Sequence, residues 1–359
     1  MKIAQVCHRY RPYIGGVPTH VREISERMAG MGFDIDVLTT DPSGKLTKEE
    51  TLNGVKVKRF DAWAPSRAYY FSRELKRYLG KESNKYDIVH AHNYQSFPLL
   101  YAAQTKCGNK LIATPHYDGG GHSFFRNLLH VPYKFLAADI FRKADRIICV
   151  SEYERSLLMP RFCLSPEKIR VIPNGINLDE FSQLTKNRKD DKLILCVSRL
   201  EKYKGIQYLI QALSKLDRLF RLEIVGKGPY KGPLVKQANS LGVAGRVTFW
   251  EELSRSDLLA KYGEAGVFVL LSRLEAYAIV VGEALAAGTP CIVISGPLSQ
   301  WVDNENCFEI YYPINVDVLA RLIAQVIGTK AGCTKLLGWD EVARRVASLY
   351  REVWEGNLG

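Results

Sequence analysis

The sequence lacks the paired cysteines that mark a disulfide framework or a zinc site. Its eight cysteines are scattered without any CxxC pair, and several stand inside apolar stretches such as IICV and LILCV. Reduced, buried thiols have this distribution. We therefore expect neither disulfides nor a zinc site.

Long apolar runs are missing as well. Stretches such as VFVLL are far shorter than the roughly 18 residues that a membrane-spanning helix needs. The first residues, MKIAQVCHRY, follow a strand-like pattern and contain neither an apolar signal core nor a small-residue cleavage site. On these grounds we expect a cytoplasmic protein.

Acidic residues are too few to balance the basic ones. The formal net charge is +12, and residues 1–180 carry 27 Lys and Arg against 19 Asp and Glu, whereas the remainder carries 23 against 19. An anionic partner is therefore expected mainly at the first half of the chain. Charge alone does not distinguish nucleic acid, acidic lipid and phosphorylated small molecules.

Strand and helix patterns alternate along the chain in two series, and 359 residues exceed the usual size of one hydrophobic core. This alternation predicts two α/β domains, each with a parallel sheet covered on both faces. The polar stretch 182–192 separates the two series. Strand patterns lie at 2–7, 34–40, 55–60, 87–92, 110–115, 146–151, 169–175, 192–200, 221–226, 246–250, 266–272 and 290–294. Helical patterns lie at 17–31, 95–106, 133–144, 205–215, 230–241, 256–264, 278–288 and 315–326.

Two motifs that follow strands are suited to binding phosphate. Gly15 and Gly16 precede a helix, where glycine lets backbone N–H groups approach an anion and the helix N-terminus adds positive charge. Arg199 and Lys204, in SRLEKYKG, are spaced to clamp a diphosphate. The alternatives are a simple turn for the glycines and a solvated basic loop for the two cations.

His116 follows a strand of the first half and precedes three glycines, in ATPHYDGGGH. A histidine there can bind a sugar hydroxyl or stabilise developing charge, and the alternative is a structural histidine. Residues 122–139 mix aromatic and aliphatic side chains with Arg126, His130 and Lys134. That segment fits either an amphipathic surface on an anionic membrane or a helix packed on its own domain.

Two further patterns carry little weight. VGKGPYKG resembles a dinucleotide fingerprint, but its glycines have the wrong spacing and no ribose-binding acid follows, so an NAD-dependent oxidoreductase has poor support. Asp34 and Asp36, in DIDV, alternate with apolar residues as on the polar face of a strand. We therefore reject a metal-binding DxD motif there.

Taken together, the motifs resemble those of the retaining glycosyltransferases of GT-B family four. The Gly-Gly loop, the histidine, IPNGIN, SRLEKYKG and a stretch with Glu275 and Glu283 follow one another in that order. The resemblance implies two facing Rossmann-like domains with a cleft between them. It also implies transfer of a hexose from a UDP- or GDP-sugar to a lipid or glycan hydroxyl, possible contact with an anionic membrane, no nucleic acid partner, and neither metal nor cofactor.

The resemblance also implies a domain division and residue roles. The first domain would cover 1–182 and a returning helix at 338–359, and the second, which binds the donor, would cover 183–337. By this resemblance, Arg199 and Lys204 would bind the diphosphate, Glu275 the sugar hydroxyls and Glu283 the ribose. His116 would lie near the reacting carbon, and Gly15 and Gly16 would approach the donor phosphates or the acceptor. The amides of Ala276, Tyr277, Ala278 and Ile279 would complete the site, and the backbone at 247–252 would contact the base.

Ala276 and Ala278 depart from the family pattern, which has glycine at both positions. Alanine would be strained there if the backbone needs positive φ, although it still donates its N–H. This departure motivates a second hypothesis, a non-catalytic protein of the same fold that binds nucleotide sugars.

Overall fold

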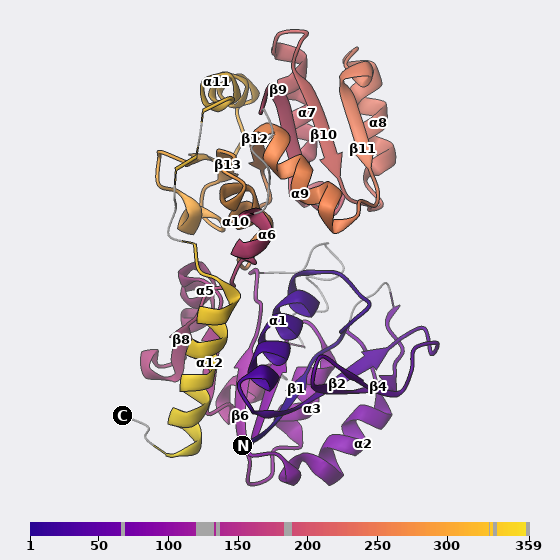
Figure 1. The fold of residues 1–359 in the computed structure, drawn as a ribbon, viewed down its shortest axis with the longest axis vertical. Helices are drawn as coiled ribbons and strands as arrows, with labels where there is room; N and C mark the ends of the chain where they lie inside the picture. The colour runs from indigo at the N-terminus through magenta and orange to yellow at the C-terminus, as the bar shows by residue number, and fades with distance from the viewer. Residues whose placement is uncertain are drawn as a thin grey trace. The chain divides into compact units, whose positions relative to one another are not determined.

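The computed structural model describes residues 1–65, 69–119, 133, 137–182, 189–329, 331–332 and 336–356. The chain divides into two compact units, one made of Met1–Gly175 with Trp339–Gly359 and the other of Ile176–Gly338. Each unit is a Rossmann-like α/β domain with a largely parallel sheet, as the alternation of patterns predicted (Figure 1).

The second unit begins at Ile176, before the polar stretch that we expected to separate the domains. The Ile176 N–H donates to the Leu337 carbonyl at 2.8 Å. Arg255 binds Glu180 through Nε at 2.9 Å and Nη2 at 2.6 Å. These interactions attach residues 176–182 to the second unit.

The sheet of the first unit is built around its first strand. Its strands are β1 (Lys2–Val6), β2 (Asp34–Asp41), β3 (Glu49–Leu52), β4 (Val55–Asp61), β5 (Ile88–His92), β6 (Lys110–Thr114), β7 (Arg146–Cys149) and β8 (Ile169–Val171). They lie in the order β3-β4-β2-β1-β5-β6-β7-β8, and among these described strands only the β3–β4 pair is antiparallel. The carboxyl ends of β1, β5 and β6 are therefore neighbours.

The sheet of the second unit is wholly parallel. Its strands are β9 (Asp190–Val197), β10 (Arg221–Val225), β11 (Val247–Trp250), β12 (Ala265–Leu270), β13 (Cys291–Ile294) and β14 (Cys307–Ile310), in the order β11-β10-β9-β12-β13-β14. Every residue of β12 is buried, as is usual for a central strand with helices on both faces. β9 and β12 are neighbours, so the loops that follow them meet at one edge.

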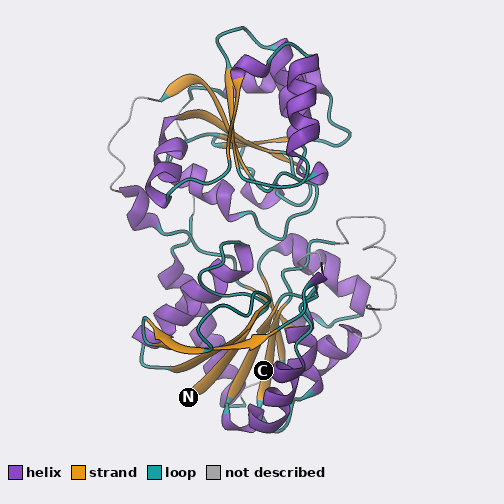
Figure 2. Cartoon of the chain, turned by 90° about the vertical axis from the view of Figure 1, so that its right-hand side faces the viewer, coloured by secondary structure: helices purple, strands orange, loops and turns teal. Residues whose placement is uncertain are grey.

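Helices flank both sheets (Figure 2). Those of the first unit include α1 (Gly16–Gly30), α2 (Arg73–Glu82), α3 (Phe97–Gln104), α5 (Glu152–Phe162) and α12 (Trp339–Trp354), and residues 137–143 are helical as well. Those of the second are α6 (Leu178–Ser182), α7 (Ile206–Lys215), α8 (Lys231–Ser240), α9 (Arg255–Glu264), α10 (Ile279–Ala286) and α11 (Val316–Val326). Among the described residues, no helix is both long and apolar enough to cross a bilayer.

The C-terminal helix α12 packs beside α1 in the first unit, as the family resemblance implied (Figure 1). The Tyr350 hydroxyl accepts a hydrogen bond from Gln5 Nε2 at 2.9 Å. At the start of α12, a Cβ added to Gly175 would lie 2.6 Å from the Trp339 Cα. The glycine of IPNG is therefore needed for this close approach.

Sequence patterns missed several elements. α2 buries Leu75 and Leu79, and most of its other residues are charged. The strands β3 and β14 have four residues each, too few for a clear alternation. The amphipathic segment 122–139 lies outside the described residues apart from positions 133 and 137–139.

The glycine-rich VGKGPYKG stretch serves packing in this fold. A Cβ on Gly226 would lie 2.1 Å from the Ser198 carbonyl oxygen, and one on Gly228 would lie 2.3 Å from that of Leu200. The Tyr230 N–H donates to the same Leu200 carbonyl at 3.0 Å. The glycines thus let the loop after β10 lie directly against the backbone on either side of residue 199.

Candidate active site

Lys204 and Glu275 form a buried ion pair at the carboxyl ends of two neighbouring strands. Lys204 ends a short 3₁₀ turn after β9, and Glu275 lies in the loop after β12. The Lys204 Nζ contacts Glu275 Oε1, and Lys204 is only 8% exposed. Burial disfavours the charge on the lysine, but the carboxylate outweighs burial and raises the pKa of Lys204 above its ordinary value. The ion pair therefore connects the loop after β9 to the loop after β12.

Arg199 and Lys204 lie on either side of one tyrosine. Arg199 is exposed, and its Nη2 donates to the Tyr203 hydroxyl at 2.7 Å. The Lys204 Nζ lies 5.1 Å from the centroid of the Tyr203 ring. The structure thus brings the two predicted diphosphate ligands into one turn, with the guanidinium open to solvent and the ammonium held against Glu275.

The loop before α10 has the left-handed backbone that glycine normally adopts. Ala278, the N-cap of α10, has φ 61° and ψ 72°. Ala276 is not among the described residues with positive φ. Before Ala278, the Tyr277 carbonyl accepts hydrogen bonds from Trp301 Nε1 at 2.7 Å and Gln300 Nε2 at 3.1 Å. This loop turns at Ala278 so that Ile279 begins the helix.

Glu283, inside α10, already has two partners from α9. The Arg255 Nη1 lies 2.7 Å from its Oε1, and the buried Tyr262 hydroxyl donates to its Oε2 at 3.0 Å. An ionised carboxylate has about four acceptor positions, so two remain after these contacts. Sequence analysis did not find Arg255 or Tyr262, because no motif links α9 to Glu283.

The backbone at 247–252, which we expected beside the base, already forms some hydrogen bonds within the protein. The Trp250 carbonyl accepts from the Gly226 N–H at 2.7 Å. The Trp250 indole donates to Glu223 Oε2 at 2.9 Å, and its ring is 37% exposed. An aromatic face therefore lies at this strand end.

His116, in the first unit, packs against two other histidines. Its φ is 50°, and its ring centroid lies 4.8 Å from that of His20 and 5.9 Å from that of His92. Burial lowers the pKa of His116 well below its ordinary value, so the ring is neutral near pH 7. No sequence pattern indicated that His20 and His92 adjoin it.

Glu154 braces the loop that carries His116. Its Oε1 accepts from the Tyr117 N–H at 2.5 Å and its Oε2 from the Val150 N–H at 2.6 Å. Burial raises the pKa of Glu154 to about 8, against the effect of these hydrogen bonds. Its sequence signal, Ser151 followed three residues later by Glu154, pointed only to the start of a helix.

Gly15 and Gly16 stand in the chain between Ile14 and Pro18, two residues that line a hollow of about 500 Å³ in the first unit. A Cβ added to Gly16 would meet no atom within 4 Å, so the protein itself does not require glycine there. The hollow is mixed in character, because it has arginines and apolar side chains. Its lining residues are Arg11, Pro12, Tyr13, Ile14, Pro18, Thr19, Arg22, Leu46, Thr47, Glu50, Leu52 and Arg59.

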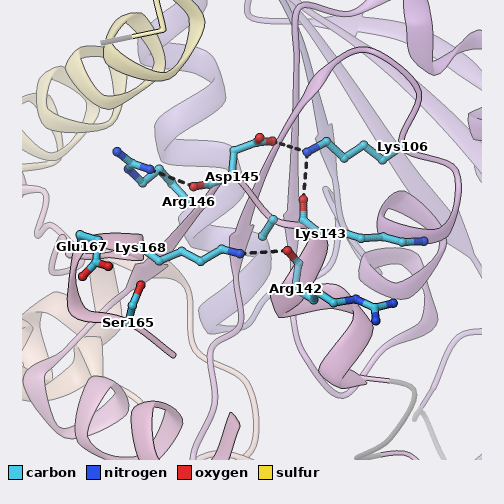
Figure 3. Close-up of a pocket in the computed structure, with 9 residues that line it drawn as sticks. Lys106, Arg142, Lys143, Asp145, Arg146, Ser165, Glu167 and Lys168 are labelled. Atoms are coloured by element: carbon cyan, nitrogen blue, oxygen red, sulfur yellow. Dashed lines mark hydrogen bonds and ion pairs between the residues drawn. The ribbon is translucent and has the colours of Figure 1, made fainter. Parts of the chain in front are cut away.

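A second hollow of the first unit, of about 520 Å³, is strongly basic (Figure 3). Lys106 Nζ binds Asp145 Oδ2 at 2.6 Å, and Lys168 Nζ donates to the Arg142 carbonyl at 2.9 Å. Four of the hollow's five basic side chains have an acidic partner: Lys106 pairs with Asp145, Arg142 and Lys143 pair with Asp139, and Arg146 pairs with Glu352. The hollow is lined by Lys106, Arg142, Lys143, Ala144, Asp145, Arg146, Ser165, Glu167 and Lys168.

The predicted site residues therefore fall into two groups. Arg199, Lys204 and Glu275 belong to the second unit, together with Glu283 and residues 276–279. Gly15, Gly16 and His116 belong to the first. The following residues were missed by sequence analysis: Tyr203, Arg255, Tyr262, Glu154, His20 and His92.

Two family descriptions match consecutive parts of the chain. Glycosyltransferase Family 4 matches residues 14–180, and Glycosyl transferases group 1 matches residues 178–336. The chain belongs to this glycosyltransferase family. It is a transferase, and the expectation of an enzyme is confirmed.

Known proteins resemble this glycosyltransferase over nearly its whole length. It is 29% identical to an uncharacterized glycosyltransferase of Methanocaldococcus jannaschii, over 99% of both chains. It is 27% identical to an alpha-monoglucosyldiacylglycerol synthase of Streptococcus pneumoniae, over 92% of this chain and 79% of the relative. Its fold matches that of Anabaena HepE in complex with UDP-glucose, with a TM-score of 0.76 and 18% identity over 97% and 99% of the two chains.

Replacing Ala278 with glycine should relieve backbone strain. A non-glycine residue in the left-handed region costs roughly 1–2 kcal/mol, whereas glycine loses about 0.5–1 kcal/mol through the entropy of the unfolded chain. Ala278→Gly should therefore be neutral or slightly stabilising. Ala276→Gly, the matched control without positive φ, should be less stable than Ala278→Gly by about 1–2 kcal/mol. Chemical denaturation measures the free energy of unfolding of both variants. Equal losses of stability in the two variants would show that Ala278 is unstrained.

Glu154 should make stability fall as pH rises. Its pKa is about 8 in the folded enzyme and 4.5 for the free side chain, so the folded state binds more protons between these values. The free energy of unfolding should then decrease by up to about 1.4 kcal/mol per pH unit across that window. Glu154→Gln cannot ionise and should flatten the slope, whereas Glu152→Gln, an exposed neighbour, should not. Urea unfolding across this pH range tests this, and parallel slopes for the wild type and Glu154→Gln would refute it.

Proposed function

We propose that this glycosyltransferase moves a hexose from a UDP-sugar to a hydroxyl group of a membrane lipid, with retention and without a metal ion at the donor. The observation that carries the proposal is the turn Arg199–Tyr203–Lys204, which meets Glu275 at the carboxyl ends of β9 and β12. Ligands of parallel α/β sheets bind at such strand ends.

The two cations would stabilise the leaving group. Breaking the bond from the anomeric carbon to the diphosphate leaves negative charge on the phosphate oxygens. Arg199 is exposed and can bind two of those oxygens through its planar guanidinium. Fixed charges placed where charge develops supply a large share of such catalysis. In this arrangement Arg199 and Lys204 take the part that a divalent cation has in metal-dependent transferases.

Lys204 and Glu275 would change partners when the donor binds. A diphosphate oxygen competes with Glu275 for the Lys204 ammonium, because both are anions within reach of one Nζ. A Glu275 carboxylate released in this way is free to accept hydrogen bonds from sugar hydroxyls. Glu283 keeps acceptor positions for the ribose beside Arg255 and Tyr262. The amides at residues 276–279 would bind the phosphates at the start of α10.

Uridine is the proposed base and retention the proposed stereochemistry. HepE is described in complex with UDP-glucose, and its fold is shared by this enzyme. The Glu275 carboxylate, once released from Lys204, is assigned to the sugar hydroxyls, which does not favour its use as the nucleophile of a covalent double displacement. We propose attack on the same face of the sugar, with the leaving phosphate taking the proton of the acceptor.

A lipid acceptor is favoured by the first unit. The hollow beside Gly16 combines apolar side chains with arginines, as suits an acceptor with an apolar part and a polar or anionic head. The basic hollow around Lys168 could face anionic headgroups. The Streptococcus pneumoniae relative is named for the synthesis of a glycosylated diacylglycerol.

Donor binding and turnover test the proposal together. Isothermal titration should show binding of UDP-glucose or another UDP-hexose in preference to GDP- and ADP-sugars, and release of UDP should follow with acceptor lipid present. Arg199→Gln should lower kcat by about 10²–10³-fold, because one charged contact to the leaving group is lost. Lys202→Gln, an exposed lysine of the same turn, is the matched control and should keep wild-type rates. Absence of binding to every nucleoside diphosphate sugar would exclude the proposal.

Flotation with lipid vesicles tests the membrane contact separately. The enzyme should float with vesicles that contain phosphatidylglycerol and remain in the soluble fraction with pure phosphatidylcholine. Lys143→Glu with Lys168→Glu, on the rim of the basic hollow, should abolish flotation. Lys192→Glu with Lys236→Glu, in the second unit, makes the same charge change and should leave it intact. A wild-type enzyme that never floats would refute the membrane contact while leaving donor binding untouched.

A further inference from the structure

Three histidines from separate elements converge inside the first unit. His20 lies on α1, His92 ends β5, and His116 follows β6. They meet because β1, β5 and β6 are adjacent in the sheet, so their carboxyl ends are adjacent too. One ring nitrogen from each histidine lies within 4.8 Å of the other two. His20 is 1% exposed and His92 is fully buried.

Hydrogen bonds fix which ring nitrogens of two of them face the cluster. His20 Nδ1 lies 2.6 Å from Asn174 Oδ1, and His92 Nε2 lies 2.8 Å from Gln5 Oε1. Both partners are carbonyl oxygens, which only accept, so each ring must carry its proton on that nitrogen. Gln5 is oriented in turn, since its Nε2 donates to the Tyr350 hydroxyl at 2.9 Å. The lone pairs of His20 Nε2 and His92 Nδ1 are therefore available.

Within the part of the chain that the structure describes, the nitrogens left over are buried and have no hydrogen-bond partner. They are His20 Nε2, His92 Nδ1 and His116 Nε2. A buried acceptor without a donor costs about 1–3 kcal/mol. When His116 carries its proton on Nδ1, all three nitrogens present lone pairs, and one metal ion can accept all three, whereas one water molecule has only two protons to donate.

We propose that His20, His92 and His116 bind a divalent transition-metal ion of the zinc type. Three imidazoles with a fourth open position are a common zinc arrangement, and imidazole also suits copper and nickel. Metal-binding histidines usually donate their second N–H to an oxygen acceptor, and Asn174 and Gln5 provide this for His20 and His92. Because His116 is partly exposed, the open position is nearest its side.

The ligands of this ion differ from the groups proposed for the donor diphosphate. The histidines belong to the first unit, and the cations proposed for the diphosphate belong to the second. The sequence predicted no metal site because the three histidines are widely spaced and match no ligand motif. His92 in particular stands inside the apolar strand pattern DIVHAH.

Metal titration tests the site without relying on catalysis. The full chain, stripped with EDTA and dialysed, should bind one Zn²⁺ ion per chain in the presence of a competing chelator. Co²⁺ should give the intense visible bands of four-coordinate cobalt with nitrogen ligands. His20→Ala or His92→Ala should lower the Zn²⁺ affinity at least about 100-fold. His8→Gln, a nearby histidine bonded to Asn93, should keep wild-type affinity.

A second variant guards against loss of folding. Asn174→Ala keeps all three histidines but removes the acceptor that orients His20, and it should weaken Zn²⁺ binding about 10–100-fold. Circular dichroism establishes that each variant is folded. Wild-type protein that binds no Zn²⁺, or binds it equally well after His92→Ala, would overturn the proposal. A cluster satisfied by hydrogen bonds alone would give the first of these results.

Discussion

The second unit depends on one buried ammonium group. Lys204 is almost closed off from water, and an unpaired charge in such a place costs several kcal/mol. The chain must therefore supply a carboxylate from a neighbouring element, and Glu275 does so from the loop after β12. Glycine at position 205 allows Lys204 to be buried, because a Cβ on residue 205 would lie 2.5 Å from the carbonyl oxygen of Leu271, directly after β12. The ion pair and the glycine together set the distance between the two loops.

The position of the loop after Glu275 follows from that constraint. With Glu275 held by Lys204, the chain has only a few residues in which to turn and begin α10. The Tyr277 carbonyl is held by Trp301, and the remaining change of direction is made at Ala278, which has to adopt a left-handed backbone. Glycine would adopt this conformation without strain. The fold therefore tolerates alanine at position 278 but would favour glycine there. The departure from the family pattern matters at one of the two positions, since Ala276 has no such requirement.

The sequence predicted what depends on local pattern and missed what depends on distant contacts. The central strands were recognisable because burial on both faces requires runs of apolar residues, as in β12. Arg199 and Lys204 were recognisable because both stand in one short loop after a strand. The partners of Glu283 were not, because Arg255 and Tyr262 lie in another helix and contribute no motif. The GKG turn resembles a dinucleotide fingerprint, but its glycines are explained by their close contact with the backbone at Ser198 and Leu200.

The two units use buried polar groups in opposite ways. Burial lowers the pKa of a histidine, so the rings of the first unit stay neutral and present lone pairs. A lysine beside a carboxylate stays charged, so the turn of the second unit presents cations. Lone pairs can bind a metal ion or accept the hydroxyl proton of an acceptor substrate. Cations can bind the phosphates of a donor. The same strand-end position in two similar folds therefore yields complementary chemistry, and the difference lies in which titratable residue each fold buries.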